Sequence, residues 1–207
     1  MADSAREPRD GALAPPAPDA DEALMLAYAA GDAAAFDRLY ARHRGPLYRY
    51  VLRQVRDAGA AEELFQDVWM NAIRARASYA PTAKFTTWLY TLAHHRVVDH
   101  WRQRGGVALV SLDDGDDGDG TGALVDALPG PRTDEPETRV ASRMTAERVR
   151  EAISALPPAQ REAFVLHVES ELPLADIARI TGEGVETVKS RVRYAYAKLR
   201  SALGDAR

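Results

Sequence analysis

The stretch LPLADIARITGEGVETVKSRVRYAYAKLRSAL, residues 172–203, has the most informative local pattern in this chain of 207 residues. Gly182 and Gly184 divide it into a short first piece and a longer second piece, because glycine is unfavourable inside a helix and common where one ends. Apolar residues mark one face of each piece, as expected for two helices packed on a shared core. They are Leu174, Ile177, Ala178 and Ile180 in the first piece and Val185, Val188, Val192, Ala195 and Leu199 in the second.

The second piece is also basic. From residue 185 to residue 203, five basic residues stand against the single acid Glu186, a local net charge of +4. Two short helices joined by a glycine-containing turn, the second of them basic, are typical of a helix-turn-helix that reads duplex DNA. The basic side chains suit contacts with DNA phosphates, while Glu186, Thr187 and Ser190 could contact the edges of the DNA bases. A three-helix bundle with a solvated basic face has the same pattern, so the two readings stay open at this point.

Helical periodicity extends over most of the remaining chain. Apolar residues recur at steps of three and four, and no stretch of useful length has the period of two that a strand requires. The sequence therefore predicts an all-α fold. Gly45 and Pro46 interrupt the first of the periodic stretches, where they would either kink the helix or divide it. These stretches are residues 33–56, 60–77, 84–102 and 140–156.

Residues 84–105, KFTTWLYTLAHHRVVDHWRQRG, combine two kinds of helix surface. One broad side is apolar and would anchor the helix in a rigid domain. The other side has hydroxyls, an imidazole and a cation at each end, which are suitable partners for a phosphate backbone and an unstacked base. The apolar side holds Phe85, Trp88, Leu89, Leu92, Ala93 and Val97, and the polar side holds Lys84, Thr87, Thr91, His95, Val98 and Arg102.

Composition and charge suggest how the chain is organised. The N-terminal 20 residues are rich in proline and alanine and lack the apolar core of a secretory signal, so we expect a disordered leader. Residues 107–138 contain nine acids and one arginine, a net charge of −8, which leaves +4 for the rest of the chain. This glycine- and proline-rich segment is interpreted as a linker. The absence of cysteine and of any apolar run long enough to span a bilayer favours a cytoplasmic protein.

Two parts of the chain resemble one known family. LPPAQREAFVLHVESELPLADIARITGEGVETVKSRVRYAYAKLRSAL, residues 156–203, is similar to the C-terminal domain of bacterial RNA polymerase sigma factors of the extracytoplasmic-function (ECF) class, in the sigma-70 family. AEELFQDVWMNAIRARASY, residues 61–79, followed by KFTTWLYTLAHHRVVDHWR, residues 84–102, is similar to their N-terminal domain. Two matches in the family's order are far more specific than one helix-turn-helix.

The resemblance implies a sigma factor that binds core RNA polymerase and directs promoter recognition, −10 melting and transcription initiation, with no catalysis of its own and no cofactor. It implies an N-terminal domain at residues 21–105, an acidic linker at 106–138 and a C-terminal domain at 139–204. The first domain would bind the polymerase clamp and open the −10 element, and the second would recognise the −35 element. The expected partners are the β′ clamp and β flap of core polymerase, promoter DNA and an anti-sigma factor, with no direct membrane insertion.

Site residues follow from matching these motifs to the sequence. Residues of the α-helical stretch 60–77 would contact polymerase, those of 84–102 the −10 element and those of the last helix the −35 element. His95 stands where many family members have asparagine, so we expect an altered base preference at −10. Glu171 stands where glycine is frequent, which predicts either a strained backbone or a different cap at that bend. The assigned sets are Glu63, Gln66, Asp67, Met70 and Asn71 for polymerase, Lys84, Thr87, Thr91, His94, His95 and Arg102 for −10, and Glu186, Thr187, Lys189, Ser190, Arg191 and Arg193 for −35.

Two other classes of protein also fit parts of the sequence. A helix-turn-helix regulator that binds duplex DNA without polymerase is the alternative function, but such a protein needs no strand-opening surface like the one in residues 84–102. A helical enzyme or metal protein could use His94, His95 and Asp99. However, His94 and His95 point about a quarter turn apart on a helix, and no other cluster completes a metal shell, so we expect neither a metal nor an enzyme.

Overall fold

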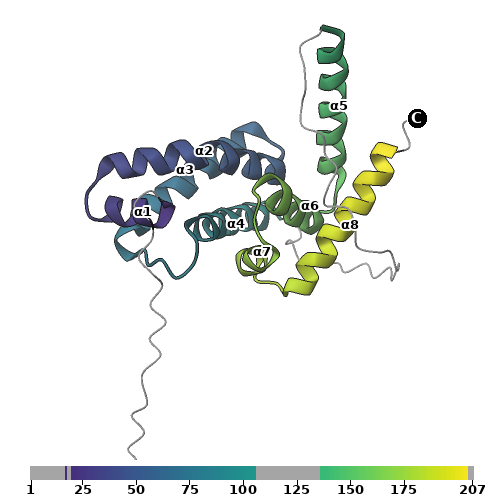
Figure 1. Cartoon of the computed structure of the whole chain (residues 1–207). Helices are drawn as coiled ribbons and strands as arrows, with labels where there is room; N and C mark the ends of the chain where they lie inside the picture. The colour runs from purple at the N-terminus through teal and green to yellow at the C-terminus, as the bar shows by residue number, and fades with distance from the viewer. Residues whose placement is uncertain (1–16, 18–19, 106–135, 205–207) are drawn as a thin grey trace, which may run out of the picture.

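The structure, a computed structural model, describes residue 17 and residues 20–105 and 136–204 (Figure 1). Within these ranges all regular structure is helical, which confirms the all-α prediction. Most of the predicted leader and of the acidic linker lies outside the described residues. The helix that follows the linker begins at Pro136, slightly before the domain start expected at residue 139.

The N-terminal part consists of four helices and a short 3-10 turn. Side-chain caps explain where two of the helices begin: an Asp32 oxygen accepts hydrogen bonds from the N–H groups of Ala34 and Ala35, and Asp57 accepts one from Ala60. The carboxylates also interact favourably with the positive end of the helix dipole. The elements are α1 (Asp21–Ala29), α2 (Ala33–Val55), α3 (Ala58–Ala75), the turn η1 (Arg76–Ser78) and α4 (Phe85–Gln103).

Helix α2 runs without a break through Gly45 and Pro46, so the possibility that this pair divides the helix was wrong. Proline removes one hydrogen bond, to the carbonyl of residue 42, and the packing of the surrounding turns compensates for it. Leu47, Tyr50 and Val51, which directly follow the proline, are fully buried.

The core of the N-terminal part lies between α2, α3 and α4, which contact one another. Leu39, Val68, Leu89 and Ala93 have no exposed surface there. Trp69, whose orientation periodicity could not decide, packs inward at 5% exposure and meets the ring of Phe36 edge-on at 5.7 Å between ring centroids. The rings of Tyr28, Tyr40 and Phe65 contact this pair, and Tyr48 in turn contacts Phe65.

The C-terminal part contains the two helices expected from residues 172–203 and two helices before them. Helix α8 packs against α5, α6 and α7, and Phe164 meets Tyr196 edge-on within this cluster. The turn between α7 and α8 contains Gly182 with φ +72°, a left-handed conformation that suits glycine. The elements are α5 (Pro136–Ala155), α6 (Pro158–Phe164), the π-helical turn η2 (Val165–Glu169), α7 (Leu174–Thr181) and α8 (Val185–Gly204).

Glu171 lies in the bend between η2 and α7 with φ +54°. A left-handed conformation costs a non-glycine residue about 1–2 kcal/mol, because the Cβ atom approaches the backbone. The strained backbone, one of the two possibilities predicted at this position, is therefore confirmed. The N–H of Leu172 closes the bend by donating to the carbonyl of Leu166 at 3.0 Å, and Leu172 itself is buried.

Candidate polymerase and promoter surfaces

Helix α3 presents a polar face on the side opposite the core. Glu63, Gln66 and Met70 are exposed, and Met70 keeps 45% of its surface in contact with solvent. Asp67 and Asn71 beside them are partly buried. The five residues predicted to contact polymerase thus share one accessible helix face, where carboxylates surround an exposed methionine, as is common at partner interfaces.

One residue of this face has a second, structural task. Asp67 forms an ion pair with Arg96 of α4, so it also ties α3 to α4. Gln66 donates to Glu62 one turn earlier at 2.9 Å. Glu63 takes part in neither of these bonds, so changing it tests the face without disturbing them.

The start of helix α4 is held by a residue that the sequence did not reveal. Lys84 occupies the N-cap position but provides no side-chain hydrogen bond. Instead, the carboxylate of Glu22, from α1, accepts a hydrogen bond from the N–H of Phe85 at 2.6 Å. A carboxylate at a helix N-terminus satisfies a free N–H and interacts with the helix dipole. Because the donor and acceptor lie 63 residues apart, no local signal predicts this cap.

Aromatic rings fix the segment that leads into α4. Tyr79, in the loop before the helix, is 8% exposed and packs edge-on against Trp88 at 5.1 Å between ring centroids. Phe85 lies beside both rings and beside His43 of α2. Burial and the nearby carboxylates of Glu22 and Asp21 raise the pKa of Tyr79, so its hydroxyl stays protonated. The loop and the first turn of α4 thus form a rigid unit.

The predicted −10 residues on α4 are not equally accessible. Lys84, His95 and Arg102 are exposed. Thr87 is buried at 3% exposure, and the hydroxyl of Thr91 donates to the backbone carbonyl of Thr87 at 2.8 Å. Helix α7 packs against α4, and Figure 1 shows the two helices close together. The C-terminal part of the chain therefore contacts α4, while three of the predicted −10 residues remain accessible.

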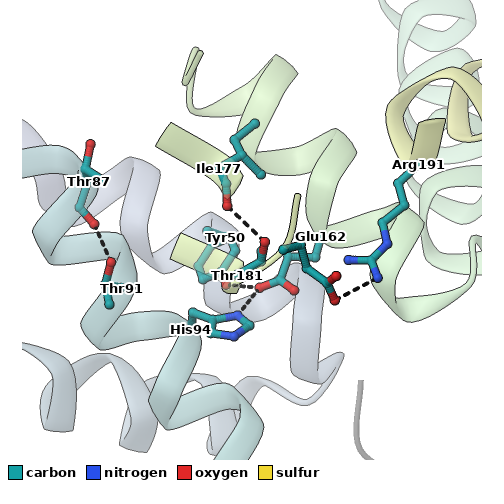
Figure 2. Close-up of polar contacts among 9 residues, drawn as sticks. Tyr50, Thr87, Thr91, His94, Glu162, Ile177, Thr181 and Arg191 are labelled. Carbon is teal, nitrogen blue, oxygen red and sulfur yellow. Dashed lines mark hydrogen bonds and ion pairs between the residues drawn. The ribbon is translucent and has the colours of Figure 1, made fainter. Parts of the chain in front are cut away.

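His94 lies inside this contact. Its Nδ1 atom is 2.7 Å from a carboxylate oxygen of Glu162, on α6, and the hydroxyl of Tyr50, on α2, donates to the same oxygen at 2.6 Å (Figure 2). Burial lowers the pKa of His94, but the hydrogen bond and negative charge of Glu162 outweigh it, so the pKa is raised above the ordinary 6.5. Burial and Glu162 also raise the pKa of Tyr50, which therefore remains a hydrogen-bond donor.

Two further contacts join the same parts of the chain. Arg53 of α2 forms an ion pair with Glu169 of η2 at 3.0 Å. The guanidinium of Arg161, on α6, donates to the carbonyls of Ser154 and Leu156 near the end of α5, and more weakly to the carbonyl of Gln54 on α2. The sequence did not predict a functional role for Tyr50 or Glu162. A periodic pattern describes each helix separately and does not indicate which helices contact each other.

The last helix, α8, presents the predicted −35 residues from its first half. Glu186, Lys189 and Arg193 are exposed, and Lys189 lies 3.3 Å from Glu186. Thr187 and Ser190 are partly buried on the same helix. Arg191 differs from its neighbours, because its guanidinium pairs at 2.9 Å with Glu183 in the turn before α8. The structure thus leaves most of this basic face accessible to a duplex.

The arrangement of the acidic and histidine side chains bears on the alternative of a metal protein. Within residues 20–105 and 136–204, no group of three or more histidine, aspartate or glutamate side chains is arranged to hold a metal ion. His94, one of the candidate ligands, is engaged with Glu162 instead. None of the described helices is both long and apolar enough to cross a membrane.

Comparison with known families identifies the class of protein. The family model for sigma-70 region 2 matches residues 39–107, and the model for sigma-70 region 4 matches residues 146–199. Fold and site therefore define a sigma factor of the sigma-70 type, which contains both regions in one chain. Sigma factors are not a class of catalytic enzymes, and the region 2 match disfavours a regulator built from a helix-turn-helix alone.

Individual relatives narrow this class. The chain is 31% identical to the ECF RNA polymerase sigma factor SigM of Mycobacterium tuberculosis, covering 89% of this chain and 85% of SigM. It is 29% identical to the ECF RNA polymerase sigma factor BldN of Streptomyces coelicolor, covering 92% of this chain and 70% of BldN. The chain belongs to the ECF RNA polymerase sigma factors, and it is a polymerase-binding protein that directs transcription initiation.

Solved structures show the same fold. CnrH, solved in complex with the cytosolic domain of CnrY, superposes with a TM-score of 0.64 at 22% identity, covering 91% of this chain and all of CnrH. The sigma factor RpoE of Bartonella quintana, solved in complex with the anti-sigma factor NepR, gives a TM-score of 0.59 at 22% identity, with 83% of this chain and 98% of RpoE covered.

Proposed function

We propose that each of the three helix faces described above performs one function of a sigma factor. The face of α3 around Glu63 and Met70 binds the β′ clamp of core polymerase, helix α4 captures the opened −10 strand, and α8 reads the −35 duplex. This assignment rests on the order in which the three surfaces follow one another along the chain. An exposed acidic face, a rigidly anchored helix with His95 and Arg102, and a basic recognition helix follow one another in a single chain.

The boundaries of these units are part of the proposal. Residues 21–105 act as the clamp-binding and −10 domain, residues 139–204 act as the −35 domain, which also contacts the β flap, and residues 106–138 connect them. The two family matches, at residues 39–107 and 146–199, fall in the two proposed domains and support this division. The protein works where the polymerase works, in the cytoplasm.

An anti-sigma factor is the proposed regulatory partner. The sigma factor RpoE, whose fold this chain shares, was solved bound to the anti-sigma factor NepR. The exposed methionine and acidic residues of α3 offer such a protein the same surface that polymerase uses, so its binding would compete with polymerase.

Replacing His95 with asparagine is expected to change base preference at one −10 position by about fivefold or more. His95 is exposed on α4, and an amide can present a paired donor and acceptor to a base edge, which an imidazole cannot. Run-off transcription with core polymerase on promoters varied singly at each −10 and −35 position measures the preference. The −35 preference serves as the internal control and should stay constant. An unchanged base preference at −10 would show that His95 does not recognise a base.

A further inference from the structure

Val185, the first residue of α8, is exposed, although its spacing placed it on the apolar face of that helix. The other four residues of that face pack on the C-terminal core. Val188 and Ala195 have no exposed surface, and Val192 and Leu199 are nearly as buried. Val185 instead keeps 44% of its surface accessible, so its expected place in the core was wrong. Burial within the chain therefore does not explain why this position is a valine.

The position of Val185 places it beside the residues proposed to read the −35 duplex. Side chains four positions apart on a helix lie one above the other, so Val185 and Lys189 share one side of α8. The exposed side chains of Glu186 and Arg193 continue this surface. In a helix-turn-helix protein, the N-terminal residues of the second helix are those that contact base edges in the major groove. Val185 thus adds an apolar contact point to a polar, basic surface at the end that faces the bases.

The turn before α8 holds Val185 in a defined place. The carboxylate of Glu183 pairs with Arg191 of α8 at 2.9 Å, and the carbonyl of Gly184 accepts a hydrogen bond from the N–H of Val188 at 3.0 Å. Valine is branched at Cβ and has one strongly preferred rotamer in a helix. Because its two methyl groups are already positioned, little conformational entropy is lost when they meet a partner.

The chemistry of the side chain limits what it can recognise. Valine has no hydrogen-bonding group, so it cannot read the donors and acceptors that distinguish most base edges. The apolar feature that a standard base presents in the major groove is the C5-methyl group of thymine. Cytosine presents an amino group instead, which loses water without gaining a partner when an apolar side chain covers it.

We propose that Val185 is a specificity-determining residue of the −35 surface and recognises one thymine by contact with its C5-methyl group. This inference rests on the proposed function, because Val185 meets DNA in this way only if α8 reads the −35 duplex. The contact buries a methyl group on each side of the interface, and one buried methyl group contributes about fourfold in affinity.

Removing single methyl groups from the DNA tests the contact. Promoters are first selected by run-off transcription with the full chain and core polymerase on a library varied at −35. Each thymine of the selected −35 element, on either strand, is then replaced singly by deoxyuridine, which pairs with adenine in the same way and lacks only the methyl group. Fluorescence anisotropy of the labelled duplex measures holoenzyme affinity. In the parent protein we expect a loss of about fourfold at one thymine.

Variants of Val185 show whether this loss belongs to the proposed contact. Val185→Ala should bind the thymine duplex about fourfold or more weakly, and the same deoxyuridine should then weaken it by less than about 1.5-fold. Val185→Thr, which keeps the branched shape and one methyl group, should retain about half of the effect in free-energy terms, or about twofold. Leu26→Ala, which truncates an exposed apolar residue of α1, should behave as the parent protein does. Circular dichroism shows whether each variant is folded.

The inference is overturned if no thymine of the −35 element responds to loss of its methyl group, if the folded Val185→Ala protein keeps the parent's response, or if the selected −35 elements contain no A·T pair. A holoenzyme that transcribes from no template in the library would contradict the proposed function itself. The two failures are therefore distinguishable, because the first requires a promoter that the holoenzyme uses.

Discussion

Replacing Glu63 with arginine is expected to weaken binding to core RNA polymerase by about 100-fold or more. Glu63 is exposed on the proposed clamp-binding face. Losing one partner of a close interfacial charge pair costs about 2–5 kcal/mol, and each 1.4 kcal/mol is a factor of ten in affinity. The reversed charge adds repulsion from a basic clamp, so about 100-fold is the lower end of the expected effect.

Titration of labelled protein with sigma-free core polymerase, followed by fluorescence anisotropy, measures this affinity. Asp37→Arg is the matched control, because it makes the same charge change at an exposed position of α2 outside the proposed face. The control should bind within about twofold of the parent protein, as expected for a surface change away from an interface. Equal affinities for Glu63→Arg and Asp37→Arg would show that α3 does not face the polymerase.

Replacing Phe85 with alanine is expected to reduce the free energy of unfolding by about 3–5 kcal/mol, the usual range for a buried phenylalanine. Phe85 is 1% exposed, and its ring contacts those of Tyr79, Trp88 and His43. The cavity would lie under the first turn of α4 and beneath the loop before it. Since domains of this size are stable by about 5–15 kcal/mol, the loss is a large fraction of the total.

Urea denaturation followed by circular dichroism gives the change in stability. Leu26→Ala provides the control, since Leu26 is 39% exposed and leaves no comparable cavity. We expect the control to change stability by less than about 1 kcal/mol. A loss below about 1 kcal/mol for Phe85→Ala as well would mean that the aromatic cluster does not anchor α4.

Much of the fold follows from local pattern. Steps of three and four placed Leu64, Phe65 and Val68 on the buried side of α3 and left Glu63 and Met70 exposed, as the structure shows. Periodicity works here because one side of each helix meets a single core. It could not orient Trp69 or decide what Gly45 and Pro46 do, because both depend on neighbouring helices that local sequence does not specify.

The candidate site was less predictable where distant segments meet. Glu162 lies in a short helix and is charged, as most surface residues are. It is nevertheless buried against Tyr50 and His94, which lie 112 and 68 positions earlier in the chain. Thr87, expected on an open polar face, is buried. Glu22 caps α4 from a different helix. Such pairings depend on tertiary packing, which no helical period encodes.

The most direct test of the account is run-off transcription by sigma-free core polymerase on a promoter library with varied −35 and −10 elements. Adding the purified chain should produce transcripts with discrete start sites from a subset of templates, and permanganate footprinting should show opened bases at −10 on those templates. If the chain does not bind core polymerase, or binds it and opens no template, the assignment of its helix faces to promoter recognition is contradicted.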